Sequence, residues 1–166
     1  DYAYATYFVS MTVWLSGAYA VCCMIKAIHQ QITVENVTIY LACVCVAQCV
    51  CALIIDSNVV IKAMVDMYVM QDQVFLTEIE RLYGIGASLD TAGVRFSACL
   101  ILIMFFLNRN KDRMTNWEIM LIGLAYIAIA VIGNMIARTT IVGVGLSLLY
   151  AFITFRPQRM SRSVFR

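Results

Sequence analysis

Three arginines lie beside or within apolar stretches of this sequence, where a charged side chain is unusual. Arg81 precedes an apolar run that ends at Leu107, Arg95 lies inside that run, and Arg138 lies inside the last long apolar stretch. A guanidinium at membrane depth costs at least about 2.5 kcal/mol unless it faces a cavity, a partner or the interface. It is also a rigid fork that binds phosphate or carboxylate bidentately without losing its charge. The arginines therefore indicate an anionic ligand.

Internal pairing is the plainer alternative for each arginine. The candidate pairs are Arg81 with Glu78 or Glu80 and Arg95 with Asp90, while Arg138 can extend to the lipid headgroups. Three arginines at one depth are harder to explain in this way than one. Whether they share a depth depends on the elements that carry them.

Those elements belong to a membrane protein. Of the 166 residues, 63% are hydrophobic and only 13% are charged, and the mean hydropathy is +0.84. A soluble domain has about 25% charged residues, so we expect a chain that works in or beside a lipid bilayer, with membrane lipid and no nucleic acid as partner. The first residue is Asp1, and the first apolar stretch lacks a basic leader and a cleavage site. We therefore expect a segment of a longer chain and no signal peptide.

The apolar runs predict an all-α fold, a polytopic bundle of about five transmembrane helices plus one short interfacial helix. A span needs about 20 mostly apolar residues. The predicted spans in this single transmembrane segment, residues 1–166, are 4–28, 37–55, 87–107, 114–132 and 135–155. The last two divide one long apolar run at Gly133 and Asn134, both of which favour turns. Arg138 would then lie about one turn inside the last helix, and the bundle is expected to be part of a larger one.

The segment between the second and third spans, residues 56–86, is too polar to cross a bilayer. Within it, residues 59–70 interrupt apolar residues with Lys62 and Asp66, after a helix-start signal at Asp56, Ser57 or Asn58. This pattern predicts an interfacial helix that lies on the membrane.

Orientation follows from the Lys and Arg content of the loops. The loop at 108–116 and the tail at 156–166 are basic, and two predicted helices separate them, so both lie on one side. Because positive loops stay in the cytoplasm, we expect a multi-pass protein of the bacterial inner membrane with a cytoplasmic tail. The net acidic segment 56–86 and the three arginines then lie on the outer side.

The cysteines and glycines of the spans have structural explanations. Six of the seven cysteines lie in the first two apolar runs, and Cys43, Cys45, Cys49 and Cys51 point to different sides of a helix. We therefore expect small apolar side chains and no metal site. Gly133, Gly143 and Gly145 are expected to let helices approach closely.

Two stretches of the sequence carry a resemblance to a known family. The first is residues 81–86 (RLYGIG), followed by residues 91–93 (TAG) and an apolar helix; the second is residues 137–143 (ARTTIVG). Together they resemble the O-antigen ligase and polymerase superfamily of bacterial membrane glycosyltransferases. The order and spacing of the helices agree over roughly residues 37–155.

This resemblance implies an enzyme that polymerises or ligates O-antigen or exopolysaccharide repeat units from an undecaprenyl-diphosphate carrier at the periplasmic face. It implies no cofactor. Arg81, Arg95 and Arg138 would bind the diphosphate and neutralise the leaving group, and Asp90 or Glu80 would accept the acceptor's proton. The family's second large periplasmic loop would follow the last helix and does not occur in these residues, so the segment alone is expected to be incomplete as an enzyme.

Two other functions remain open. A transporter or flippase of lipid-linked oligosaccharide, or of another anionic substrate, would use the same arginines during alternating access. Such folds often show internal repeats and helices broken near the midplane, and no convincing repeat occurs here. A non-enzymatic subunit could instead bind a partner protein through its acidic outer segment.

Overall fold

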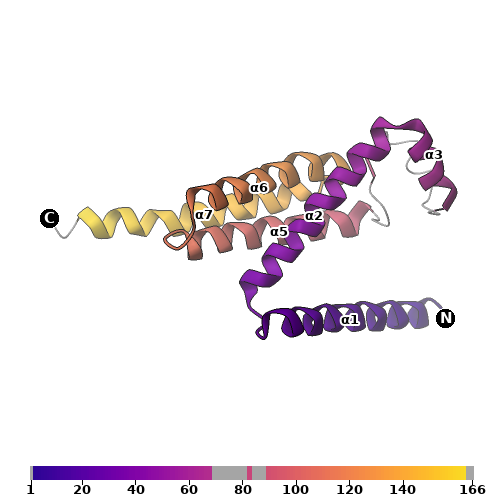
Figure 1. The fold of residues 1–166 in the computed structure, drawn as a ribbon, viewed down its shortest axis with the longest axis horizontal. Helices are drawn as coiled ribbons and strands as arrows, with labels where there is room; N and C mark the ends of the chain where they lie inside the picture. Colours follow the sequence, from indigo (N-terminus) through magenta and orange to yellow (C-terminus); the bar gives the residue numbers. More distant parts are fainter. Residues whose placement is uncertain (1, 69–81, 84–88, 164–166) are drawn as a thin grey trace. The chain divides into compact units, whose positions relative to one another are not determined.

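The computed structural model describes residues 2–68, 82–83 and 89–163, and all of its regular structure there is helical (Figure 1). The helices are α1 (Tyr2–His29), α2 (Val34–Ser57), α3 (Val59–Tyr68), α5 (Leu89–Asn110), α6 (Asn116–Ile136) and α7 (Thr140–Ser163). This confirms the predicted all-α class.

Four of these helices have the length and composition of membrane spans. They cover Thr6–His29, Val34–Ser57, Thr91–Asn110 and Asn116–Ile136, and a shorter apolar helix covers Thr140–Thr154. The chain is therefore a helical, multi-pass membrane bundle, and the observed spans overlap all five predicted ones.

The chain divides into two compact units, residues 1–37 and 38–166. In the first unit, α1 is apolar on all sides and nearly all of its described side chains are exposed, as expected for a helix in lipid. Two hydroxyl groups near the middle of α1 form hydrogen bonds with the backbone of the same helix. Thr12 donates to the Phe8 carbonyl and Ser16 to the Thr12 carbonyl, both at 2.8 Å.

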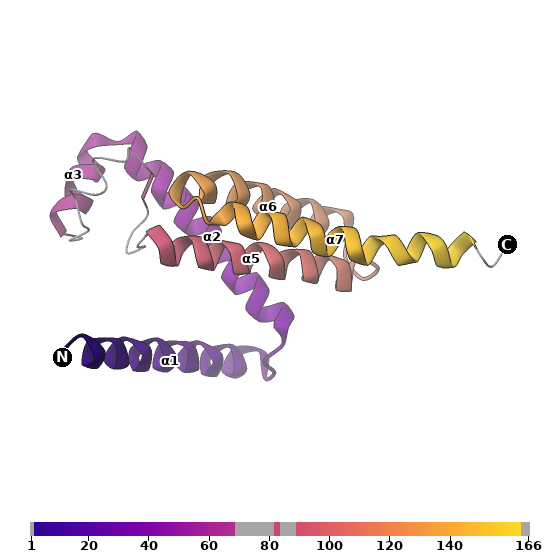
Figure 2. The ribbon, with the colours of Figure 1, turned by 180° about the vertical axis from the view of Figure 1, so that it is seen from behind.

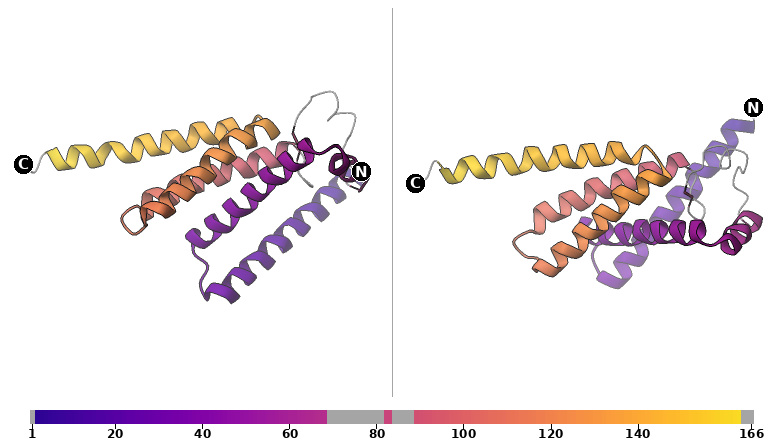
Figure 3. Two further views of the ribbon diagram at one scale, coloured as in Figure 1. Left: turned by 45° about the horizontal axis from the view of Figure 1, so that its top comes forward. Right: turned by 90° about the horizontal axis from the view of Figure 1, so that it is seen from above.

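The second unit is built around α5, α6 and α7, which lie side by side in every view (Figures 1 and 2). The α5 and α7 helices run in the same direction at a constant register. Ser97 donates to the Thr139 carbonyl at 3.0 Å, and farther along Asn108 donates to the Tyr150 hydroxyl at 3.5 Å. Both bonds join residues separated by 42 positions. The antiparallel α6 connects the two helices (Figure 3).

The core of this unit lies between α2, α5 and α6. Cys45, Cys49 and Ala52 recur on one face of α2, and all three are buried. They belong to the same apolar cluster as Ala92, Phe96 and Cys99 on α5. The cysteines of this face act as small apolar side chains, as predicted.

Close approach between α5 and α7 depends on glycine. A methyl group on Gly143 would collide with the Ser97 backbone, and one on Gly93 would collide with the Thr139 hydroxyl. A methyl group on Gly133 would lie 3.2 Å from the Phe96 ring and from the Thr140 side chain, so this position is also tightly packed. The prediction of packing glycines is confirmed for Gly133 and Gly143. It is wrong within the described residues for Gly145, which faces open space.

The predicted turn at Gly133 and Asn134 is wrong. The α6 helix continues to Ile136, and residues 137–139 form the turn. The Gly133 carbonyl accepts hydrogen bonds from the Ala137 N–H at 2.8 Å and the Thr140 hydroxyl at 3.0 Å, which ties the turn to the last helical residues. Gly133 is therefore glycine because of packing, not because of a turn. Arg138 lies in the turn itself and not one turn inside the last helix.

The predicted helix after residue 58 is present as α3, Val59–Tyr68. Its start is capped by Asn58, whose side-chain oxygen accepts from the Val60 N–H at 3.0 Å and the Ile61 N–H at 3.3 Å. The last two residues of the predicted range, 69 and 70, lie outside the described residues, and the location of α3 on a membrane surface stays a prediction.

Candidate functional site

Residues 91–93, the described helical part of the first stretch that carries the family resemblance, meet the second stretch at one end of the second unit. Gly93, near the start of α5, lies against the side chain of Thr139 in the turn before α7. Ser97 donates to the carbonyl of the same threonine at 3.0 Å, and its backbone lies against Gly143. Residues 91–93 and 137–143 therefore form one joint between helices. The predicted outer end of the bundle is built around this joint.

Arg138 lies at this joint. It immediately precedes Thr139, so the α5 contacts of that threonine fix the backbone of the turn from which the arginine projects. Its side chain is exposed, and within the described residues it forms no hydrogen bond or ion pair. The guanidinium therefore retains its full capacity to bind an anion.

Arg95 lies nearly two turns into α5, which begins at Leu89, and is two positions from both Gly93 and Ser97. Its Nε points back toward the helix start and lies 3.4 Å from the Thr91 carbonyl. Side chains on a helix lean toward its N-terminus, so the charged group lies nearer the end of the bundle than the Arg95 Cα. Among the described carboxylates none forms an ion pair with it.

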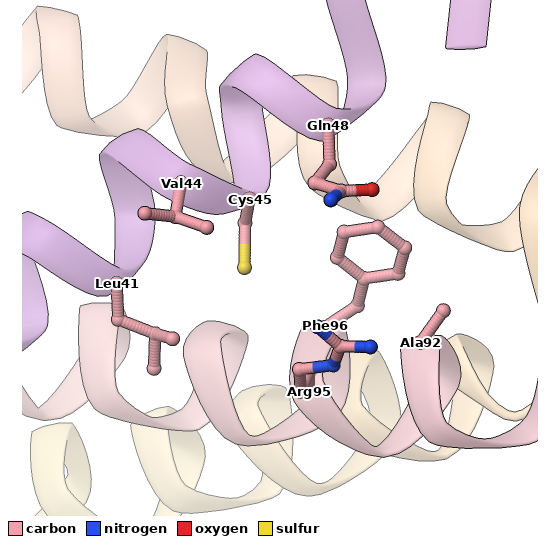
Figure 4. A pocket seen from close by; sticks show the side chains of 7 residues that line it. All are labelled: Leu41, Val44, Cys45, Gln48, Ala92, Arg95 and Phe96. Carbon is pink, nitrogen blue, oxygen red and sulfur yellow. The ribbon is translucent and has the colours of Figure 1, made fainter. Parts of the chain in front are cut away.

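A small hollow opens beside Arg95, between α2 and α5 (Figure 4). It is lined by Leu41, Val44, Cys45 and Gln48 of α2 and by Ala92, Arg95 and Phe96 of α5. Its volume is about 20 Å³. In the close-up, the guanidinium lies at the α5 side of this hollow and the Gln48 amide lies above the Phe96 ring.

The structure places Arg95 and Arg138 at the same end of the bundle but on different sides of α5. Gly93 and Ser97 are four positions apart and form the face that contacts the turn and α7. Arg95, midway between them in sequence, projects toward α2. A ligand that contacts both guanidinium groups must therefore extend over the end of α5.

The remaining predicted site residues cannot be located in the same way. Arg81 and Glu80 lie outside the described residues. Asp90 belongs to the first turn of α5, but its side chain lies outside the described part. The roles of all five predicted residues stay predictions.

Comparison of the chain with protein-family models, with curated proteins and with solved structures returned no match. The candidate site is therefore defined by its own geometry. Within the described residues, no group of three or more His, Cys, Asp or Glu side chains is arranged to hold a metal ion.

A second polar cluster next to α3 was not predicted from the sequence. The buried Tyr83 donates its hydroxyl proton to an Asp66 carboxylate oxygen at 2.6 Å, and the Lys62 ammonium lies 5.8 Å from the centre of the Tyr83 ring. Burial raises the pKa of Tyr83, and the hydrogen bond to Asp66 and the charges of Asp66 and Asp56 raise it further. The spacing of Lys62 and Asp66 was visible in the sequence, but nothing local linked them to Tyr83.

This cluster holds the chain just ahead of α5 against α3. Leu82, next to Tyr83, is buried in the same apolar cluster as Ala52 of α2 and Ala92 of α5. The residues that follow Arg81 in the sequence are thus fixed to the bundle by one apolar and one polar side chain. A cation over an aromatic ring adds about 0.5–2 kcal/mol to such a contact.

Proposed function

We propose that this chain is part of a bacterial inner-membrane glycosyltransferase. It polymerises or ligates O-antigen or exopolysaccharide repeat units taken from an undecaprenyl-diphosphate carrier at the periplasmic face. The observation that carries the proposal is the joint of Gly93, Ser97 and Thr139, because it brings residues 91–93 of the first family-like stretch against the second stretch, residues 137–143.

The charge at this joint supports a lipid diphosphate as ligand. Arg95 and Arg138 lie at one end of the bundle, and neither has an ion-pair partner among the described residues. Each guanidinium fork can bind one phosphate bidentately, so the two arginines together supply the positive charge that a diphosphate needs. A carrier lipid also places its phosphates at the membrane interface, where such a helix end lies.

The proposed chemistry requires charge stabilisation and a proton acceptor. As the bond between the sugar C1 and the diphosphate oxygen breaks, negative charge grows on the diphosphate. Fixed guanidinium groups stabilise that charge more in the transition state than in the ground state. The acceptor hydroxyl attacks C1 and gives its proton to a carboxylate, for which Asp90 and Glu80 are the candidates.

The direct genetic test is Arg138→Ala in the full-length protein. We expect the glycan ladder on a gel to shorten or disappear, since removing one charge that stabilises the transition state typically costs about 10²–10³ in rate. Arg113→Ala, in the predicted cytoplasmic loop, is the matched control and should leave the ladder unchanged.

An unchanged ladder with Arg138→Ala would contradict the proposal. The same cells also distinguish a glycosyltransferase from the alternative, a transporter or flippase. A glycosyltransferase defect leaves lipid-linked repeat units at the periplasmic face, whereas a flippase defect leaves them at the cytoplasmic face.

A further inference from the structure

The hollow between α2 and α5 combines one charge with an apolar lining. Apart from Arg95 and Gln48, its lining side chains are the apolar Leu41, Val44, Cys45, Ala92 and Phe96. At about 20 Å³, the hollow has room for one water molecule or one methyl group. A buried water needs two to four polar partners, and this lining is nearly all carbon. The hollow therefore suits a methyl group.

The position of the hollow relative to the charge restricts what that methyl group can belong to. The Arg95 side chain turns back toward the Thr91 carbonyl, at the end of the bundle. From there the α2 side of the lining continues from Gln48, near the middle of the span, to Leu41, two turns closer to the Val34 end. An occupant with a negative group at Arg95 and an apolar chain with a branch near that group would match both the charge and the hollow.

We propose that this hollow receives the branch methyl group of the first isoprene unit of a polyprenyl phosphate or diphosphate, whose phosphate binds Arg95. The inference rests on the proposed function, which supplies a polyprenyl carrier, and adds the group by which the protein selects it. A straight acyl chain has no branch and leaves the hollow empty. The hollow then distinguishes the carrier from the far more abundant phospholipids of the same membrane.

Exposure around the hollow allows a chain to enter from the lipid. Val44 lies at its α2 side and is 56% exposed, whereas Cys45 and Phe96 behind it are 3% exposed each. The hollow is thus lined by buried side chains and by one exposed side chain, that of Val44. A lipid chain can lie along this exposed side chain without unpacking the core.

The test measures binding to the full-length protein in nanodiscs with three diphosphates that share a main-chain length. Farnesyl diphosphate is branched and unsaturated, its fully hydrogenated form is branched and saturated, and dodecyl diphosphate is straight. Competition against radiolabelled farnesyl diphosphate should show both branched probes binding about three- to tenfold more tightly than the straight one. Equal binding of all three would overturn the proposal.

Variants test whether the preference for branched probes depends on the hollow. Val44→Phe should fill the hollow and abolish the preference for branched probes while leaving the affinity for dodecyl diphosphate. Val50→Phe, at an exposed position of α2 that does not line the hollow, should keep the preference. Arg95→Gln should weaken all three probes about equally. A preference that survives in Val44→Phe, and in the smaller change Val44→Met, would overturn the proposal.

The two proposals fail separately. If the branched probes are preferred but the full-length protein transfers no glycan, the lipid site stands and the glycosyltransferase proposal fails. If transfer depends on Arg95 and Arg138 but branched and straight probes bind equally, only the selection by the hollow is overturned.

Discussion

At the scale of residues, Tyr83 joins groups that the sequence keeps apart. Its hydroxyl binds Asp66, 17 positions earlier, and its ring lies under the Lys62 ammonium. The phenol is buried, so its ionised form loses solvation and also meets the charge of a carboxylate. The neutral phenol is therefore part of what holds the chain ahead of α5 to α3.

This arrangement predicts that the contribution of Tyr83 to the free energy of unfolding changes at alkaline pH. A raised pKa in the folded state means that the folded protein keeps the proton after an unfolded chain has lost it. The contribution of Tyr83 is therefore fully present below about pH 10, the ordinary tyrosine pKa, and is lost as the pH rises above it. At neutral pH, Tyr83→Phe should lower the free energy of unfolding by about 1–3 kcal/mol, because the hydrogen bond from the Tyr83 hydroxyl to the Asp66 carboxylate is lost.

Denaturant unfolding of wild type and Tyr83→Phe at pH 8 and above pH ~10 measures whether the contribution of Tyr83 to the free energy of unfolding falls as the pH rises. The difference between the two proteins should shrink at the higher pH. Tyr68→Phe is the control, since the Tyr68 side chain is 77% exposed, and it should change stability little at either pH. A difference that grows with pH would contradict the assignment.

At the scale of elements, α5 and α7 are held together by small residues at a fixed register. Gly143 lies on the Ser97 backbone, while Gly145, two positions on, faces open space. The pair therefore offers the same substitution in two environments of one helix.

Gly143→Ala should destabilise the purified protein in detergent by about 1–3 kcal/mol, because the added methyl group collides with the backbone of α5 and that backbone must move. Gly145→Ala should have no such cost and can gain up to about 1 kcal/mol from helix propensity. Thermal unfolding of the two variants measures both. Similar melting temperatures would show that α7 does not pack on α5 as described.

The helices were largely predictable from the sequence, whereas the contacts between helices were not. Apolar length predicted every span, and Asn58 marked the start of α3 because its side chain can cap a helix. The prediction of a turn at Gly133 was wrong, since glycine occurs both in turns and where helices pack closely. Only the Phe96 ring of α5, which lies next to Gly133, distinguishes the two cases. The same limit applies to the site. The sequence placed Arg95 and Arg138 near one depth, but the side of α5 that each occupies depends on where α2 and α7 pack.

At the scale of the whole molecule, the proposed function requires the arginines to lie on the periplasmic side. Within the second unit, α3 and the turn at 137–139 lie toward the start of α5, and the loop at 111–115 lies at its other end. The basic loop is predicted to be cytoplasmic, which places the start of α5 outside.

Labelling with a membrane-impermeant maleimide tests this orientation in a variant without the seven native cysteines. Met67→Cys in α3, where the native side chain is 77% exposed, should be labelled in intact spheroplasts. Lys111→Cys, beyond α5, should be labelled only after the membrane is broken. The reverse pattern would place the arginines in the cytoplasm and remove the carrier's glycan from their reach.

The most direct measurement of the central claim is glycan transfer by the purified full-length protein in liposomes that contain undecaprenyl-diphosphate-linked repeat units. We predict that wild type releases undecaprenyl diphosphate as longer glycans form, without added metal or nucleotide sugar. Arg95→Gln and Arg138→Ala should each slow this release about 10²-fold or more. Release at the wild-type rate by both variants, or no release by the wild type, would contradict the account.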